Sequence, residues 1–222
     1  MEIIAKIYND FPTKFAVPRQ SGLVDAPSTI VFEKEYRVKE ALRGLEGYSH
    51  IWLLWSFHDL KRQGWEPTVR PPRLGGNTRM GVFATRSPFR PNPLGLSCVK
   101  NERIELHTDE GPVIFVSGAD LMNGTPIYDI KPYLPYTDCH PEASGGFAEA
   151  VRRKRLRVDC PPELLSQISE PHRAAVLEIL SQDPRPSYQH DPNRVYGMAY
   201  AGMDVRFSVD GERLIVREIR KS

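Results

Sequence analysis

The chain has 222 residues with a formal net charge of +2, and 40% of them are hydrophobic and 26% charged. This composition is typical of soluble globular proteins, and the length favours one large domain plus a small one. No apolar run approaches the roughly 20 residues of a membrane span, and the first residues lack the basic segment of a signal peptide. Cys98, Cys139 and Cys160 are widely spaced and odd in number, so we expect reduced thiols in the cytoplasm rather than a disulfide framework.

The first 137 residues alternate short apolar runs with polar loops. A short helix is expected at Tyr36–Leu42, ending at Gly44. The run His50–His58 is the clearest element, because its mostly apolar residues indicate a strand buried on both faces. Many strands with little helix between them predict a mainly β fold, either a barrel or a sandwich. The expected strands are Met1–Tyr8, Thr29–Phe32, His50–His58, Arg79–Ala84, Leu96–Leu106, Pro112–Asp120 and Ile127–Ile130.

The rest of the chain predicts a linker and a small α+β domain. Residues 138–150 are small, polar and rich in glycine, which is typical of a linker. Within residues 151–222, Pro161–Leu180 spaces its apolar residues like an amphipathic helix that Pro171 interrupts. Asp210-Gly211 provides a hairpin turn. The expected antiparallel strands are Val195–Tyr200, Val205–Val209 and Leu214–Ile219.

Basic residues are unevenly distributed along the chain. Positions 61–103 hold nine Lys or Arg residues against two glutamates, and positions 151–158 hold five and no acid. Such segregation favours a polyanionic partner such as nucleic acid. A pair of solvated basic faces is the alternative.

Several familiar sites are absent from the sequence. It contains no GxGxxG, no GxxxxGK[ST] and no GxSxG pattern, so dinucleotide, P-loop and nucleophile-elbow sites are unsupported. His58-Asp59 is an adjacent pair, as in some metal phosphohydrolases, but no second set at metal-ligand spacing accompanies it. We therefore expect no metal.

Candidate binding residues lie in polar loops at strand ends, where a scaffold fixes the loop bases and leaves the side chains accessible. Pro18-Arg19-Gln20 lies in the first such loop. His58 stands at the exit of the clearest strand, with a surface-capping histidine as the alternative. In Arg70–Gly81, the pair Gly75-Gly76 allows close backbone approach to a ligand.

The segment ATRSPFRPNPLGLS, residues 84–97, holds three prolines and two arginines. Its prolines exclude a regular helix and bias the residues before them towards extended backbone. We expect a stiff, polyproline-like arm that displays Arg86, Arg90 and Asn92 with little entropy left to lose on binding. A structural crossover that shields an edge strand is the alternative.

The segment Asn123–Tyr133 runs from a Gly/Pro turn into an expected strand. Alternate residues of a strand point to one side, so Asp129, Lys131 and Tyr133 are expected to share a face. Three ionisable groups on one side are costly in a core and indicate a site. An ordinary solvent-facing strand is the alternative.

Long segments of the chain closely resemble the TrmO family of tRNA methyltransferases, also described as TsaA-like or YaeB proteins. Residues 183–188 add the Asp-Pro-Arg-Pro-x-Tyr element of the family's small C-terminal domain. The resemblance covers nearly the whole chain. The segments that carry it are Lys14–Leu23, Leu45–Trp55, Arg70–Ser97 and Gly124–Tyr136.

This resemblance implies an S-adenosylmethionine-dependent enzyme, built on a single-sheet β-barrel and acting as a homodimer with the cofactor near the subunit interface. The barrel would occupy residues 1–137, and residues 151–222 would assist tRNA binding. Many members carry Asp where this chain has Asn123, which keeps an acceptor oxygen but no charge. The residues that correspond to the family's cofactor contacts are Pro18, Arg19, Gln20, His58, Asp59, Arg86, Leu96, Asn123, Gly124, Thr125 and Pro126.

The reaction implied is methylation of N6 of the adenosine 3′ of the anticodon in threonine tRNA, after that base has been threonylcarbamoylated. Our hypothesis is that Asp129 or Tyr133 accepts or aligns the N6 proton, while Lys131 or Arg90 steers the threonyl carboxylate. Asn92 is a further candidate for the tRNA side. A phosphate-contacting patch is expected at Arg152, Arg153 and Lys154.

Two other functions fit the same residues. A non-catalytic RNA-binding β-barrel could keep the fold, although the Arg86 and Asn123–Tyr133 elements are intact apart from Asn123. A methyltransferase for another RNA or for a small molecule is the second, because the residues that read the base cannot be separated in sequence from those that bind the cofactor.

Overall fold

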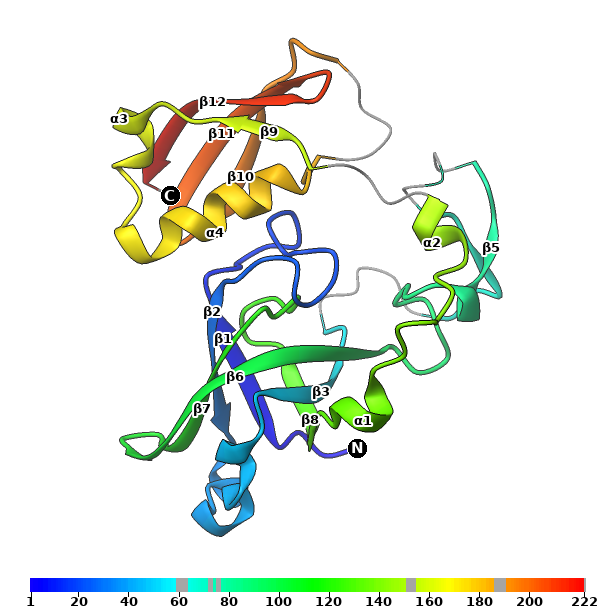
Figure 1. Ribbon diagram of the computed structural model, residues 1–222, viewed down its shortest axis with the longest axis vertical. Coiled ribbons are helices and arrows are strands. Elements are labelled where there is room, and N and C mark those ends of the chain that lie inside the picture. Colours follow the sequence, from blue (N-terminus) through cyan, green and yellow to red (C-terminus); the bar gives the residue numbers. More distant parts are fainter. Residues whose placement is uncertain (59–63, 72–73, 75–76, 151–154, 186–190, 222) are drawn as a thin grey trace.

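The computed structural model describes residues 1–58, 64–71, 74, 77–150, 155–185 and 191–221 (Figure 1). Its N-terminal part is a closed six-stranded barrel with antiparallel neighbours in the order β1-β2-β7-β6-β3-β8. The prediction of a mainly β fold with a barrel is therefore confirmed. The barrel strands are β1 (Ala5–Asn9), β2 (Pro27–Phe32), β3 (His50–Ser56), β6 (Leu94–Thr108), β7 (Gly111–Ser117) and β8 (Pro126–Pro132).

Strand β3 buries only one of its faces, so the expectation of burial on both faces was wrong. Its burial alternates residue by residue, with Ile51, Leu53 and Trp55 in the core. In a closed barrel the inner face fills the interior and the other face points outward. The apolar residues Trp52 and Leu54 therefore lie half-buried on the outside of the barrel.

Two expected elements of the barrel domain form differently. Only Met80–Gly81 (β5) of the expected strand at 79–84 is extended, where it pairs with β4 (Thr68–Val69), and Val82–Ala84 forms a 3₁₀ turn. The expected helix at 36–42 is a pair of 3₁₀ turns, because Val38 between them has extended backbone. The 3₁₀ turns between β2 and β3 are Lys34–Tyr36, Lys39–Leu42 and Leu45–Gly47.

The C-terminal part pairs a four-stranded sheet with helix α4 (Glu170–Ser181). The three expected antiparallel strands form, as β10 (Tyr196–Tyr200), β11 (Met203–Asp210) and β12 (Arg213–Lys221). The sequence did not predict β9 (Arg157–Asp159), which pairs in parallel with β12. Pro171 lies in the first turn of α4, where proline is tolerated, and the short α3 (Pro162–Leu165) ends before it.

The connection between β1 and β2 packs into the C-terminal core. Phe11, Ala16, Val24 and Ala26 belong to the same buried cluster as α4 and the inner faces of β10–β12. Figure 1 shows this blue loop reaching towards α4, away from the barrel. The proposed boundaries at residues 137 and 151 stay predictions, and the β1–β2 loop is attached to both parts of the protein.

Two short helices lie between the barrel and the small sheet, α1 (Pro135–Asp138) and α2 (Phe147–Ala150). Residues 139–146 between them contain neither helix nor strand. None of the helices in the described part of the chain is long and apolar enough to span a membrane.

Candidate cofactor and substrate site

Several connections meet at one end of the barrel, where β1, β3 and β7 end and β2, β6 and β8 begin. The Gly22 N–H donates to the Gly118 carbonyl at 2.8 Å, which joins the β1–β2 and β7–β8 connections. Gly118 has φ +82°, and an added Cβ would lie 3.4 Å from the Gly22 nitrogen. A side chain there would therefore be strained and crowded. The Phe57 N–H donates to the Pro93 carbonyl at 3.1 Å, which places the exit of β3 beside the entry to β6.

The turn between β7 and β8 contains the predicted cofactor residues Asn123–Pro126. Gly124 has φ +78°, and the Thr125 hydroxyl donates to the Met122 carbonyl at 2.8 Å. Thr125 and Pro126 are buried, whereas Asn123 is exposed. The side-chain oxygen of Asn123 accepts the N–H of Asn9 at 3.0 Å, so the acceptor that distinguishes Asn from an apolar residue stabilises this turn.

Gln20 and Arg86, predicted from separate segments, are in direct contact. The Arg86 guanidinium donates to the side-chain oxygen of Gln20, and Arg86 itself is exposed. Pro18, two residues before Gln20, is buried. Arg19 turns the other way, because its Nη2 donates to the carbonyls of Asp183 and Arg185 at 3.2 and 3.3 Å. The predicted tripeptide is therefore shared between the site and the C-terminal part.

Asp120 is a site residue that the sequence did not single out. Its Oδ1 accepts a 2.5 Å hydrogen bond from the Ser97 hydroxyl, and Ser97 accepts one of 2.9 Å from the Trp55 indole N–H. Burial raises the pKa of Asp120, although Ser97, the charge of Arg86 and the N–H of Ser21 oppose the rise. Asp120 ends an expected strand in the sequence, and it comes beside Ser97 where the antiparallel register of β6 and β7 continues beyond Lys100 and Ser117.

A β-bulge at Tyr128 determines which face of the barrel Asp129 and Lys131 lie on. Ile127 and Ile130 both pack against the barrel core although they are three residues apart. Beyond the bulge, alternation turns Asp129 and Lys131 to the outer face. Bulges of this kind re-aim side chains and are frequent next to active sites.

One row across the outer face joins a predicted cofactor residue to a predicted catalytic one. Leu54 on β3 is in register with Leu96 on β6 and with Asp129 on β8. Leu96 is 56% exposed. The Asp129 carboxylate accepts the Ile130 N–H at 2.9 Å and forms a 3.0 Å ion pair with Lys131. Asp129 therefore lies nearer the cofactor end of the barrel than the other two candidates.

Tyr133 lies beyond the end of β8, further from that end of the barrel. Its N–H donates to the His50 carbonyl at 3.0 Å, and its ring lies 5.7 Å from that of Trp52. Burial, and then the neighbouring Cys139, raise the pKa of the Tyr133 phenol. A neutral phenol donates and accepts hydrogen bonds but is a poor proton acceptor at neutral pH, whereas the carboxylate of Asp129 can accept a proton.

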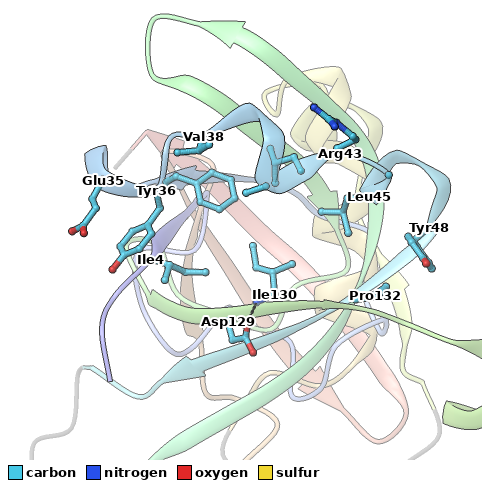
Figure 2. A pocket seen from close by; sticks show the side chains of 14 residues that line it. Ile4, Glu35, Tyr36, Val38, Arg43, Leu45, Tyr48, Asp129, Ile130 and Pro132 are labelled. Atoms are coloured by element: carbon cyan, nitrogen blue, oxygen red, sulfur yellow. Dashed lines mark hydrogen bonds between the residues drawn. The ribbon is translucent and has the colours of Figure 1, made fainter.

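A pocket of 510 Å³ lies between the 3₁₀ turns and strand β8, beside Ile4 and the end of β2 (Figure 2). Among the predicted site residues, only Asp129 lines it. Ile4, Tyr36 and Ile130 contribute apolar surface, and Glu35 and Arg43 lie at its rim in the view of Figure 2. The pocket is distinct from the Gln20–Arg86 contact at the other end of the barrel.

The remaining predicted residues differ in how far the structure describes them. Arg90 closes its own loop, with Nη1 2.8 Å from the Thr85 carbonyl. Asn92 and His58 are exposed. In the described ranges, no three His, Cys, Asp or Glu residues are arranged to hold a metal ion. Four predicted residues lie outside the described part of the chain: Asp59, Arg152, Arg153 and Lys154.

The comparisons with known proteins identify one family. Residues 6–139 match the model of the tRNA-methyltransferase O N-terminal domain, and residues 153–222 match that of the TrmO C-terminal domain. A protein named tRNA (adenine(37)-N6)-methyltransferase from Escherichia coli K12 is 41% identical, over 94% of this chain and 92% of its own. One of the same name from Eikenella corrodens is 49% identical, over 78% of this chain and 97% of its own.

The fold agrees with that family. The crystal structure of TrmO from Pseudomonas aeruginosa superposes with a TM-score of 0.77 at 32% sequence identity, covering 99% of this chain and 95% of that one. The family models match nearly the whole chain, and the relatives and the solved structure agree on the same family. The chain belongs to the TrmO family of tRNA methyltransferases.

Proposed function

We propose that this protein transfers a methyl group from S-adenosylmethionine to N6 of the adenosine 3′ of the anticodon in tRNA. The observation that carries the proposal is the convergence of Gln20, Arg86 and Asp120 at one barrel end, in a chain of this family. Two relatives bear names that describe S-adenosylmethionine-dependent or S-adenosyl-L-methionine-binding proteins. The finer substrate is threonine tRNA that already carries threonylcarbamoyl on that adenosine.

The donors and acceptors at this end of the barrel fit such a cofactor. S-adenosylmethionine carries a carboxylate, an ammonium, a sulfonium and an adenine, and it supplies an electrophilic methyl group when bound. The Arg86 guanidinium matches the carboxylate, since arginine presents a planar fork to carboxylates. The Asp120 carboxylate lies behind Arg86 and adds negative charge to this end of the barrel, which favours a cofactor with an ammonium and a sulfonium. Asn123 and the neighbouring backbone groups offer hydrogen bonds to adenine, and no phosphate-binding glycine motif is required.

The acceptor nitrogen must be positioned and relieved of its proton. Its lone pair is delocalised into the purine, so a base aligned with the N6–H assists attack. Asp129 is the favoured base, because it shares a row with Leu96 and points to the outer face of the barrel. Holding the reacting atoms at roughly 3–3.5 Å supplies much of the rate enhancement by positioning alone.

The tRNA would approach the basic segment at residues 61–103. Arg79 and Asn92 lie in the segment between β4 and β6 and are exposed, and phosphate contacts from such residues dominate affinity for RNA. Arg90 is engaged with its own loop and would turn to the threonyl carboxylate only in the complex. The basic run Arg152–Lys154 remains a sequence-based part of this proposal.

We also propose that the protein acts as a homodimer. Leu96 and the half-buried Leu54 leave apolar surface on the outer face of β3 and β6. Tyr133 lies seven residues after Pro126, which is about 23 Å along an extended strand. That distance is long for one bound cofactor and one nucleotide to contact both residues. A second subunit packed on this face could bring its own residues to the site.

Incubation with methyl-labelled S-adenosylmethionine and total tRNA, followed by nucleoside analysis, tests the enzymatic proposal. We expect label in a methylated, threonylcarbamoylated adenosine, and its loss with Arg86→Ala. Binding of tRNA without any methyl transfer would instead support a non-catalytic RNA-binding barrel. Label in another nucleoside would keep the chemistry and change the substrate. Size-exclusion chromatography with light scattering tests the dimer.

A further inference from the structure

The carboxylate of Asp120 connects the segments that form the candidate cofactor site. It accepts a 2.5 Å hydrogen bond from the Ser97 hydroxyl, and the backbone of Ser21 and the positive charge of Arg86 favour its ionised form, which lowers its pKa against the effect of burial. Ser21 directly follows Gln20, which accepts a hydrogen bond from Arg86. Asp120 is thus the common partner of the β1–β2 loop, the proline-rich arm and strand β6.

Burying the Asp120 carboxylate at this position costs free energy of folding. Ser97 is fully buried and Asp120 is partly buried in the barrel mouth, where ionised groups lose solvation. A buried charge of this kind adds little to the free energy of unfolding, because apolar or amide groups of similar size often stabilise the fold equally well. Ionisable groups with such perturbed environments cluster at functional sites.

The surrounding packing holds the carboxylate in one orientation. The Trp55 indole donates to Ser97 at 2.9 Å and its ring lies 4.4 Å from that of Phe57. The same ring covers Gly95, where an added Cβ would lie 2.2 Å from it. Ser97 is therefore fixed, and its hydroxyl hydrogen is directed at Asp120.

We propose that ionised Asp120 is a positioning residue for S-adenosylmethionine, holding the Ser21 N–H and the Arg86 guanidinium in the arrangement that binds the cofactor's amino-acid end. This inference rests on the proposed function, since it assumes that the cofactor occupies this end of the barrel. Asp120 acts through Ser21 and Arg86, and the neutral form would release both. Arg86 would then lose its alignment with Gln20.

A pH dependence follows from this arrangement. The pKa of Asp120 is raised in the free protein, so the cofactor binds to a form that is depleted as the pH falls through that raised value. Affinity is then full above the pKa of Asp120 and falls about tenfold per pH unit below it. The cofactor's own carboxyl and amino groups keep their charges between about pH 4.5 and 7.

The experiment is titration calorimetry of S-adenosylmethionine with the full-length protein from pH 4.5 to 7.5. We expect the wild type to lose affinity towards acid pH. Asp120→Asn should bind about tenfold more weakly at pH 7 with a flat profile. Asp109→Asn, in the exposed turn at the opposite end of the barrel, is the matched control and should follow the wild type.

Ser97→Ala provides a second test that keeps the carboxylate. Removing a hydrogen bond that favours the ionised form raises the pKa of Asp120 further, so the acid limb should move to higher pH. A merely structural role for Ser97 would weaken binding equally at every pH. Circular dichroism at each pH confirms that the compared proteins are folded.

The outcomes separate this inference from the proposed function. If the wild type binds no S-adenosylmethionine at any pH, the proposed function fails. If Asp120→Asn binds S-adenosylmethionine as tightly as the wild type at pH 7, Asp120 is not the positioning group. An acid limb that persists unchanged in Asp120→Asn would also overturn the inference, because it would belong to another group.

Discussion

The Arg19 guanidinium donates a 3.2 Å hydrogen bond to the backbone carbonyl of Asp183, which lies 164 residues further along the chain. The neighbouring Asp183 and Arg185 side chains form an ion pair at 2.8 Å that is almost fully buried. Gln20, the next residue after Arg19, contacts Arg86 at the candidate site. The C-terminal part is therefore linked to the cofactor site through two consecutive side chains.

Arg19→Ala should destabilise the protein by about 1–3 kcal/mol, because buried carbonyls lose their donor. Urea denaturation measures this change. Arg206→Ala is the matched control, since Arg206 pairs with Asp204 at the surface and such pairs contribute about 0–1 kcal/mol. We also expect weaker binding of S-adenosylmethionine in Arg19→Ala. Equal stability of the two variants would show that the link between the two parts is not energetically important.

Asp129→Asn should slow methyl transfer by about 10²-fold or more while leaving the affinity for S-adenosylmethionine unchanged, as expected for loss of a general base. Single-turnover assays with saturating cofactor measure this. Lys131→Ala is informative as a companion, because it removes the 3.0 Å ion-pair partner of Asp129 but leaves the carboxylate. A wild-type single-turnover rate in Asp129→Asn would rule out this residue as the base.

Gly95→Ala should destabilise the barrel by about 1–3 kcal/mol or more through overpacking. An added Cβ at residue 95 would lie 2.2 Å from the Trp55 ring, and displacing that ring would disturb its bond to Ser97. Gly81→Ala is the control, because nothing lies within 4 Å of a Cβ there. Thermal unfolding compares the two. Equal melting temperatures would mean that Trp55 moves without consequence.

Replacing Arg152, Arg153 and Lys154 by Ala should weaken tRNA binding and flatten its dependence on salt. Each lost phosphate contact lowers the slope of log K against log salt by about 0.7–0.9. Filter binding over a salt titration measures the slope. The control replaces the exposed Lys34, Lys39 and Arg43, which lie in or beside the 3₁₀ turns at the other end of the barrel. A slope that is unchanged in the first variant would reduce the basic run to a solvated surface.

Much of the barrel could be predicted from local patterns. The apolar run that forms β3, and in the C-terminal sheet the turn at Asp210-Gly211, each depend on neighbouring residues alone, and both formed where expected. Residues Phe11, Ala16 and Val24 could not be assigned in this way, because their burial depends on a sheet far along the chain. The same holds for β9, whose parallel partner lies more than 50 residues away.

The candidate site was predictable only in its separate segments. The shared face of Asp129 and Lys131 followed from alternation, but the bulge at Tyr128 that turns this face outward has no sequence signal. Asp120 was missed because it ends an apolar strand and joins no motif. Its importance depends on Ser97, which the pairing of β6 with β7 places beside it, and on the β1–β2 loop that contains Ser21.

The most direct test of the central claim uses threonine tRNA prepared with and without threonylcarbamoyl on the adenosine 3′ of the anticodon. The protein is incubated with methyl-labelled S-adenosylmethionine, and the nucleosides are separated and identified. We predict label at N6 of that adenosine in the threonylcarbamoylated tRNA, and none in the unmodified tRNA. Label in neither tRNA, with the cofactor bound and the protein folded, would contradict the account.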